Sequence, residues 1–154
     1  MAHFNSGFSL TPSMPKNYEI FEHAADISVR VTGRDLQELF KNAGLAIFQI
    51  SSRKQFIKDK KHTVITIKQN AKNLEELFIN WLNKLLSLSV ANGLIFHNIK
   101  INRLEDNSLE ASCRGSGILN YKVNVEIKAA VYRELKLEKA GLGWATNVIF
   151  EISA

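Results

Sequence analysis

Cysteine and proline are scarce in this chain of 154 residues, which contains one cysteine and two prolines. A single cysteine excludes a disulfide-stabilised scaffold and any metal site built from several thiolates of one chain. It also suits a reducing compartment. With only eight glycines the chain cannot be collagen-like, and a hydrophobic content of 45% excludes disorder over most of its length.

Long apolar runs and familiar catalytic signatures are missing as well. No apolar stretch approaches the ~18–20 residues that a membrane helix needs. Residues 1–16 lack the basic start and apolar core of a signal peptide, and we therefore expect a cytoplasmic protein. The chain has no G-x-S-x-G, no phosphate-binding glycine loop followed by lysine, and no H-E-x-x-H, which argues against a conventional hydrolase or transferase.

The length and the residue pattern predict one domain preceded by a tail. Residues 1–16 are small and polar, include Pro12 and Pro15, and show no periodicity, which is typical of a flexible N-terminal tail. The remaining residues, 17–154, are long enough to bury an ordinary hydrophobic core. We therefore expect a single folded domain over residues 17–154.

Periodicity within that domain predicts two helices and several strands. Apolar and polar side chains alternate over residues 26–31, as in a strand with one buried face. Asp35 and Asn73 are each followed three residues later by glutamate and then by apolar residues at helical spacing. Alternation returns from residue 99 onward and predicts one long strand over residues 123–131. The simplest packing is an α+β fold of two layers, with a mostly antiparallel sheet and both main helices on one face.

The net charge of +5 is concentrated in residues 53–61. This segment combines one acid with five basic residues, Arg53, Lys54, Lys58, Lys60 and Lys61. Such a segment can contact the phosphates of RNA directly, or weakly through an RNA-loaded partner. It can equally be a solvated connector, because no aromatic residues alternate with the charges as a base-stacking surface requires.

Carboxylates at the two ends of the domain are the candidate functional residues. Glu22, His23 and Asp26 precede or begin the first strand, and Asp26 lies on its polar face. These side chains are either ligands of a hard cation or ordinary loop charges with Asp26 as a cap. Glu151 interrupts an apolar terminal strand, so it lies on a solvated face, pairs with a positive group or provides a second ligand. Cys113 lies on the apolar side of a strand, which is typical of a small core residue.

Three blocks of the sequence, in this order, resemble the archease family. They are YEIFEHAADISVRVTGRDLQELFKNAGLAIF, NLEELFINWLNKLLSLSVANGLIF and VNVEIKAAVYRELKLEKAGLGWATNVIFEI. The resemblance covers about residues 17–154. It implies a small α/β protein that is not itself an enzyme. Archeases activate the GTP-dependent RNA ligase that joins tRNA halves after intron removal, promoting ligase guanylylation and multiple turnover.

The resemblance also implies a divalent cation, with calcium as the expected ion. The N-terminal acid of the family falls on Asp26, the C-terminal acid falls on Glu151, and Ile152 offers a backbone carbonyl. Glu22, His23 and Arg133 are candidates for positions beside these ligands.

The chain departs from the family pattern at three positions. Ala24 replaces a threonine, Arg133 replaces a histidine after Tyr132, and Glu151 replaces an aspartate. A positive Arg133 near the site would weaken cation binding. Two functions of different class remain open, a ligase activator and a stand-alone chaperone-like or RNA-binding module that uses residues 53–61.

Overall fold

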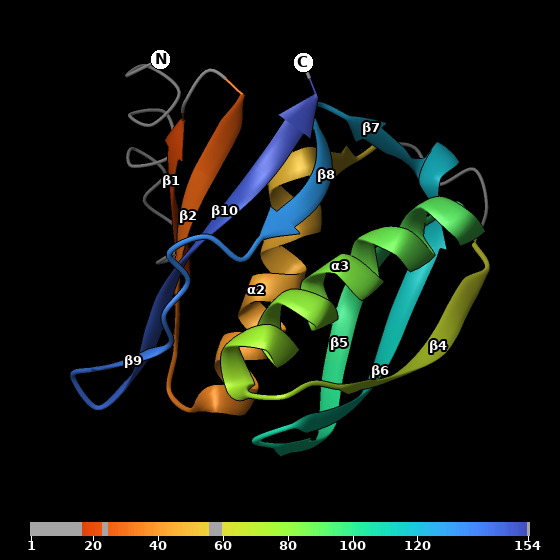
Figure 1. Ribbon diagram of the computed structural model, residues 1–154. Helices are drawn as coiled ribbons and strands as arrows, with labels where there is room; N and C mark the ends of the chain where they lie inside the picture. The colour runs from red at the N-terminus through yellow and green to blue at the C-terminus, as the bar shows by residue number, and fades with distance from the viewer. Residues whose placement is uncertain (1–16, 23–24, 56–59, 154) are drawn as a thin grey trace.

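The computed structural model describes residues 17–22, 25–55 and 60–153, which form two α-helices, one short 3-10 helix and ten strands (Figure 1). The α-helices are α2 (Leu36–Ser51) and α3 (Leu74–Asn92), and every strand pairing is antiparallel. The expected α+β class with two main helices is therefore confirmed. No helix of the described residues is long and apolar enough to cross a membrane.

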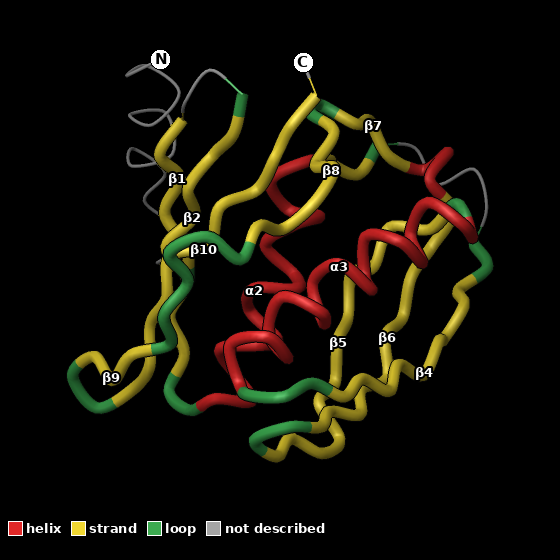
Figure 2. The backbone as a smooth tube through the Cα atoms, viewed as in Figure 1, coloured by secondary structure: helices red, strands yellow, loops and turns green. Residues whose placement is uncertain are grey.

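The strands of the first sheet come from the two ends of the chain. Its path is β1-β2-β10-β8, and β9 pairs with the other part of β10. The bounds are β1 (Tyr18–Glu22), β2 (Asp26–Gly33), β8 (Glu126–Val131), β9 (Glu138–Ala140) and β10 (Gly143–Ser153). Because β2 pairs with β10, the start of the domain lies beside its end (Figure 2).

The middle of the chain forms two further sheets. One has three strands in the order β4-β6-β5, with bounds β4 (His62–Asn70), β5 (Leu94–Glu105) and β6 (Ser108–Gly117). The other pairs β3 (Ser52–Lys54) with β7 (Tyr121–Val123), and the short helix η1 (Ile118–Asn120) precedes β7.

Both helices cover the same face of the first sheet, and the β4-β6-β5 sheet covers their other side. Helix α2 contacts β2 and β5, while α3 contacts β8 as well as β4, β5 and β6. The helices approach each other closely at Gly44, where an added Cβ would lie 2.8 Å from Leu85 and 2.9 Å from Ile99. The outer face of the first sheet carries no helix among the described elements, which leaves its polar side chains accessible.

The helix starts follow the sequence signals. The Asp35 carboxylate accepts a hydrogen bond from the Glu38 amide at 2.8 Å, and the Asn73 side chain accepts one from the Glu76 amide at 2.9 Å. Each bond satisfies an amide that has no partner within the helix. At the end of α3, Gly93 adopts the left-handed conformation with φ 60°, which glycine tolerates without a Cβ clash.

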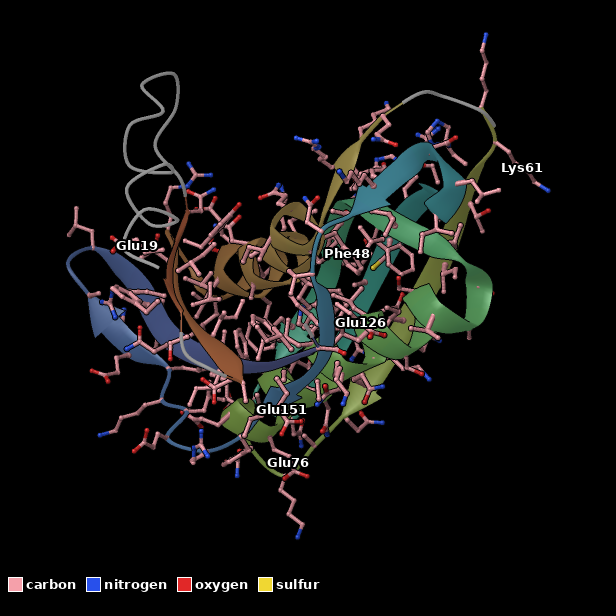
Figure 3. The ribbon with its side chains drawn as sticks, turned by 90° about the horizontal axis from the view of Figure 1, so that it is seen from above. Glu19, Phe48, Lys61, Glu76, Glu126 and Glu151 are labelled. Atoms are coloured by element: carbon pink, nitrogen blue, oxygen red, sulfur yellow. The ribbon has the colours of Figure 1, made fainter. Side chains whose placement is uncertain are left out.

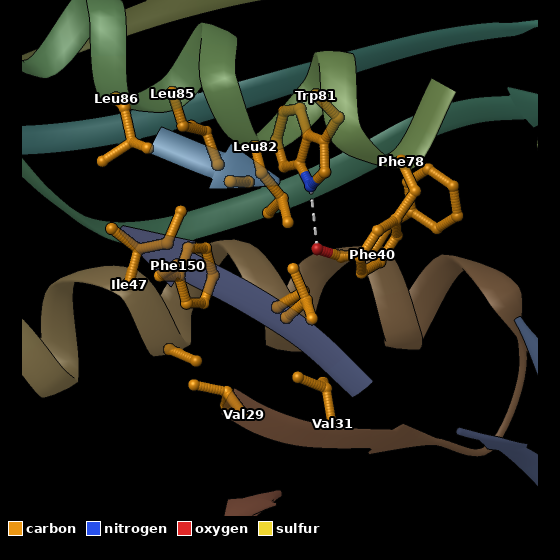
Figure 4. Packing of buried hydrophobic residues seen from close by; sticks show 14 of the residues in the cluster. Val29, Val31, Phe40, Ile47, Phe78, Trp81, Leu82, Leu85, Leu86 and Phe150 are labelled. Atoms are coloured by element: carbon orange, nitrogen blue, oxygen red, sulfur yellow. Dashed lines mark hydrogen bonds between the residues drawn. The ribbon is translucent and has the colours of Figure 1, made fainter. Parts of the chain in front are cut away.

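The core lies between the two helices and the sheets on either side of them, and Figure 4 shows part of it at the first sheet. Trp81 is fully buried, and its indole nitrogen donates to the Phe40 carbonyl at 2.9 Å. The Phe40 and Phe78 rings meet edge to face with centroids 5.0 Å apart, a favoured aromatic geometry. Side chains of β2 and β10, including Val29 and Phe150, close the cluster from the sheet.

The prediction of one long strand over residues 123–131 is wrong. Val123 belongs to β7 and residues 126–131 form β8, so the chain changes sheets between them. The amides of Asn124 and Val125 both donate to the Ser51 carbonyl at the end of α2, at 2.7 and 3.3 Å. These hydrogen bonds to the end of α2 interrupt a segment in which apolar and polar residues alternate regularly. The segment after α2 also contains a short strand, β3, that sequence analysis did not predict.

Cys113 is a core residue, as expected. It is fully buried on β6, and burial raises the pKa of its thiol to about 12. Since the thiolate is the reactive form, we expect no modification by Ellman's reagent at about pH 8 while the protein is folded. Addition of urea should release one reactive thiol per chain. Rapid labelling under native conditions would show that β6 opens locally.

Candidate functional site

The outer face of β2 and β10 bears the polar residues identified in the sequence. Along β2, Ile27, Val29 and Val31 are buried, whereas Asp26 and the other alternate residues stay partly accessible. Along β10, Phe150 is buried and Glu151 is exposed. The parities predicted for Asp26 and Glu151 are therefore confirmed. Both carboxylates lie on the side of the sheet that faces away from the helices.

Strand pairing places these two acids side by side. Asp26 and Glu151 are direct partners in the antiparallel register of β2 and β10. Residues that lie opposite each other in such a pair project from the same face, with Cβ atoms ~4.5–5.5 Å apart. Figure 3 shows Glu151 near the end of β10, beside the start of β2. Two like charges at this spacing repel each other, so this position favours a cation.

Ile152 ties the start of β2 to the end of β10. Its amide donates to the Ala25 carbonyl at 3.2 Å, immediately before Asp26. On the other side of β10, the register with β8 shifts between Glu151 and Ile152. Such irregularities redirect side chains and backbone groups and are common beside functional sites. The carbonyl of Ile152 as a ligand stays a prediction.

Arg133 is a positive group beside the acid pair. Its Nη2 atom lies 3.8 Å from Oδ2 of Asp26, and the two side chains are 63% and 28% exposed. The turn after β8 positions it, with the Leu135 amide donating to the Tyr132 carbonyl at 3.1 Å and Glu134 at φ 62°. An exposed ion pair of this kind contributes only ~0–1 kcal/mol to stability. The ion pair matters for the charge of the site, because Arg133 offsets the negative charge of Asp26, one of the two carboxylates.

The other two residues of the N-terminal cluster are not placed beside the pair. The backbone of Glu22 pairs with Ile27 in the β1–β2 ladder. The Glu22 side chain and His23 lie outside the described residues, and their expected roles stay predictions.

The acid pair suits a hard cation in its donor chemistry. Calcium prefers carboxylate and carbonyl oxygens and takes ~6–8 of them. Asp26 and Glu151 supply carboxylate oxygens on one face, and neighbouring carbonyls or water would have to supply the rest. Within residues 17–22, 25–55 and 60–153, no group of three or more histidine, cysteine, aspartate or glutamate side chains gathers. Any cation would also have to displace Arg133 from Asp26.

The basic segment forms part of a larger positive cluster. Arg53 and Lys54 are exposed on β3, while Lys60 and Lys61 are exposed before β4. Lys58 lies outside the described residues. Strand pairing adds residues that sequence analysis missed, with Lys122 of β7 opposite Arg53 and Arg114 of β6 on the neighbouring sheet. No local sequence signal connects these positions to residues 53–61, because only the sheet pairings bring them together.

Comparison with known proteins assigns the family. The model of the archease protein family matches residues 18–152. The protein archease of Methanosarcina mazei is 32% identical over 149 residues, covering 92% of this chain and 99% of that protein. The protein archease of Methanosarcina acetivorans is also 32% identical, with 92% and 99% coverage.

Two solved structures share the fold. The solution structure of protein 1598 of Methanobacterium thermoautotrophicum superposes with a TM-score of 0.63 at 22% identity, covering 89% of this chain and 99% of that one. The crystal structure of an archease from Thermotoga maritima, described as a "possible chaperone", gives a TM-score of 0.56 at 25% identity, with 85% and 94% coverage.

The family match bears on the expected function as well as on the fold. It confirms the expectation of a protein of the cofactor or chaperone type that is not an enzyme. The division into a tail at residues 1–16 and a domain at residues 17–154 stays a prediction. By its sequence over residues 18–152 and by its fold, this chain belongs to the archease family.

Proposed function

We propose that this protein activates a GTP-dependent tRNA-splicing RNA ligase, promoting ligase guanylylation and multiple turnover. The observation that carries the proposal is membership of the archease family over residues 18–152. A cofactor role also agrees with the state of Cys113, the single cysteine, whose buried thiol is a poor nucleophile. The ligase would therefore retain the covalent chemistry, while this chain would contribute a binding surface.

We further propose that Asp26 and Glu151 hold a divalent cation, calcium in the first instance, with the Ile152 carbonyl as a third ligand. The direct pairing of the two acids across β2 and β10 supports this assignment. When bound, the ion would supply a positive charge that oxygen atoms of the partner can also coordinate. Asp26 and Glu151 would orient it, and Arg133 would act as the internal counter-ion in its absence.

The proposal is tested with purified ligase and labelled GTP, without RNA. This protein should raise the rate at which label enters the ligase chain, and its own chain should stay unlabelled when the two are resolved. Omission of RNA restricts the assay to guanylylation. Label on this chain, or an unchanged ligase rate, would contradict the proposal.

Asp26→Asn should reduce the activation by at least about tenfold. Even mutation of residues that only hydrogen-bond to metal ligands commonly lowers metal affinity or activity by about 10–100-fold. The substitution keeps the size of an accessible side chain, so the melting temperature should change little. Asp106→Asn is the matched control, since Asp106 is an exposed aspartate in the turn between β5 and β6. Equal activation by both variants would remove Asp26 from the site.

A stand-alone chaperone-like or RNA-binding module is the second candidate. The description of the Thermotoga maritima archease as a possible chaperone favours it, and so does the positive cluster around β3. An unchanged guanylylation rate, together with direct RNA binding, would support this alternative.

A further inference from the structure

The positive cluster draws its residues from two neighbouring sheets. Arg53 and Lys54 lie on β3, and Lys122 lies opposite Arg53 on β7. Arg114 on β6, His62 at the start of β4 and His97 on β5 belong to the β4-β6-β5 sheet. All six side chains are exposed. They lie along the edge where β3 and β7 adjoin the beginning of β4 and the end of β6. Arg53 and Lys122 project from one face of the β3–β7 pair, and Lys54 projects from the other and lines a groove together with His97.

The two histidines contact each other, and the charges of basic neighbours act on His97. His62 Nδ1 lies 3.2 Å from His97 Nε2, with the rings meeting edge to face. Partial burial of the exposed His97 ring lowers its pKa, and the charges of His62, Arg114 and Lys54 lower it further. Positive groups from β3, β4 and β6 therefore converge on one histidine of β5.

The four described segments that form this surface contain no acidic residue. The described residues 52–55, 60–64, 94–98 and 114–123 contain no aspartate or glutamate. Elsewhere on the β4-β6-β5 sheet, basic residues have acidic neighbours, such as Lys68 at 4.0 Å from Glu110. These four segments thus carry a concentrated positive charge.

This arrangement costs stability in the free protein. Arg53 and Lys122 face each other directly across the β3–β7 pair, and like charges in that position are destabilising. The short strands, of three residues each, gain little backbone pairing to offset the repulsion. A bound polyanion would convert the repulsion into attraction. Two positive side chains facing each other are unfavourable for the stability of the free protein, but they are favourable for binding an anion.

The shape of the surface indicates what kind of anion fits. A shallow groove of about 180 Å³ runs beside Arg53, Lys54, His97 and Tyr121. This volume is below the ~300–1,000 Å³ of a pocket that encloses a small molecule. Phe48 and Phe96 also line the groove, but they are only 5% and 1% exposed and offer no free ring for a base. The ring of Tyr121 is partly buried, and its hydroxyl lies 3.0 Å from the Ser116 hydroxyl. Contacts with phosphates along a chain are favoured over recognition of bases.

We infer that this edge, formed by Arg53, Lys54, Lys122, Arg114, His62 and His97, binds the phosphate backbone of RNA without sequence specificity. The inference rests on the second candidate function and deepens it, because it names the surface and the ligand chemistry of an RNA-binding module. It concerns the isolated protein and needs neither ligase nor metal, so its failure is distinguishable from failure of the ligase proposal. An ion-driven contact of this kind has a Kd of ~10⁻⁴–10⁻⁶ M at physiological salt.

The test is fluorescence anisotropy of an end-labelled single-stranded RNA of about 20 nucleotides, titrated with the full chain at about 50–200 mM KCl. Wild type should bind, and the logarithm of its affinity should fall linearly with the logarithm of salt concentration. The triple variant Arg53→Gln, Lys54→Gln, Lys122→Gln should bind at least about tenfold more weakly, with a salt slope smaller by about 2 for three lost phosphate contacts.

A matched control removes the same charge elsewhere. Lys72, Lys84 and Lys100 are exposed on other parts of the molecule, so their triple change to glutamine lowers the net charge equally. It should retain most of the affinity. The patch variant should also melt at the same temperature as wild type or higher, because the Arg53–Lys122 repulsion is gone. If it nevertheless melts lower, the double variant Lys54→Gln, Arg114→Gln provides the same binding test without altering that pair.

Three results would overturn the inference. The first is no binding of RNA by the wild type, and the second is equal loss of affinity in the patch and control variants. The third is binding of poly-glutamate without binding of RNA, which would assign the surface to an acidic protein segment. None of these results affects the guanylylation assay, which contains no RNA, so the two proposals fail independently.

Discussion

Trp81→Ala is expected to lower the free energy of unfolding by about 3–5 kcal/mol. Trp81 is fully buried between the helices, and its indole donates to the Phe40 carbonyl at 2.9 Å. The substitution leaves a large cavity against Phe78, Leu82 and the first sheet, and it removes that hydrogen bond. Domains of this kind have only ~5–15 kcal/mol of net stability, so the variant should be close to unfolding at room temperature.

Urea denaturation followed by far-ultraviolet circular dichroism measures this loss. Trp144→Ala is the matched control, because Trp144 is partly exposed on β10 and its ring contacts the Lys139 ammonium at 5.1 Å. That change should cost well under half as much, since the side chain buries less surface. Trp81→Phe retains most of the volume and should fall between the two. A loss below about 1 kcal/mol for Trp81→Ala would contradict the packing between α2 and α3.

Calcium should raise the melting temperature of chelator-treated protein by roughly 5–10 °C when it is present at a hundredfold excess over its Kd. Binding to the folded state alone contributes about 2.7 kcal/mol at that excess. For a chain of this length each kcal/mol corresponds to about 2–4 °C. The physical reason is the pair Asp26 and Glu151, whose mutual repulsion across β2 and β10 the ion would relieve.

Charge variants around the pair identify the ligands. Glu151→Gln should abolish the shift, whereas Glu19→Gln, which removes an exposed acid from β1 of the same sheet, should leave it unchanged. Arg133→Gln should lower the Kd for calcium, because the guanidinium at 3.8 Å from Asp26 no longer competes with the ion. Without calcium, this variant should lose no more than ~1 kcal/mol, as expected for an exposed ion pair. Calcium insensitivity of both wild type and Arg133→Gln would exclude the cation site.

Local chemistry explains why so much of the secondary structure could be predicted. Asp35 and Asn73 cap the helices that follow them through bonds to amides only three residues away. Alternation along β2 places Asp26 on the outer face and Val29 in the core with no reference to distant residues. Signals of this range are contained in a few consecutive residues.

Hydrogen bonds between distant segments explain why the division of residues 123–131 and the strand β3 were not predicted. Residues 123–131 alternate regularly, yet the Ser51 carbonyl at the end of α2 binds the amides of Asn124 and Val125 and divides the segment between two sheets. The preference for β3 over an irregular connector likewise depends on its partner β7. A hydrogen-bond partner that lies far along the chain leaves no mark in the local pattern.

The sequence by itself determined the fold class, both helices, the family resemblance and the outward direction of Asp26 and Glu151, because these follow from local pattern and composition. The tertiary structure decided which charges meet. The β2–β10 register places Asp26 opposite Glu151, and the turn after β8 brings Arg133 to Asp26. The β3–β7 pairing sets Lys122 against Arg53. Electrostatic interactions depend on distance in space, and distance in space between residues far apart in the chain is set only when the strands pair.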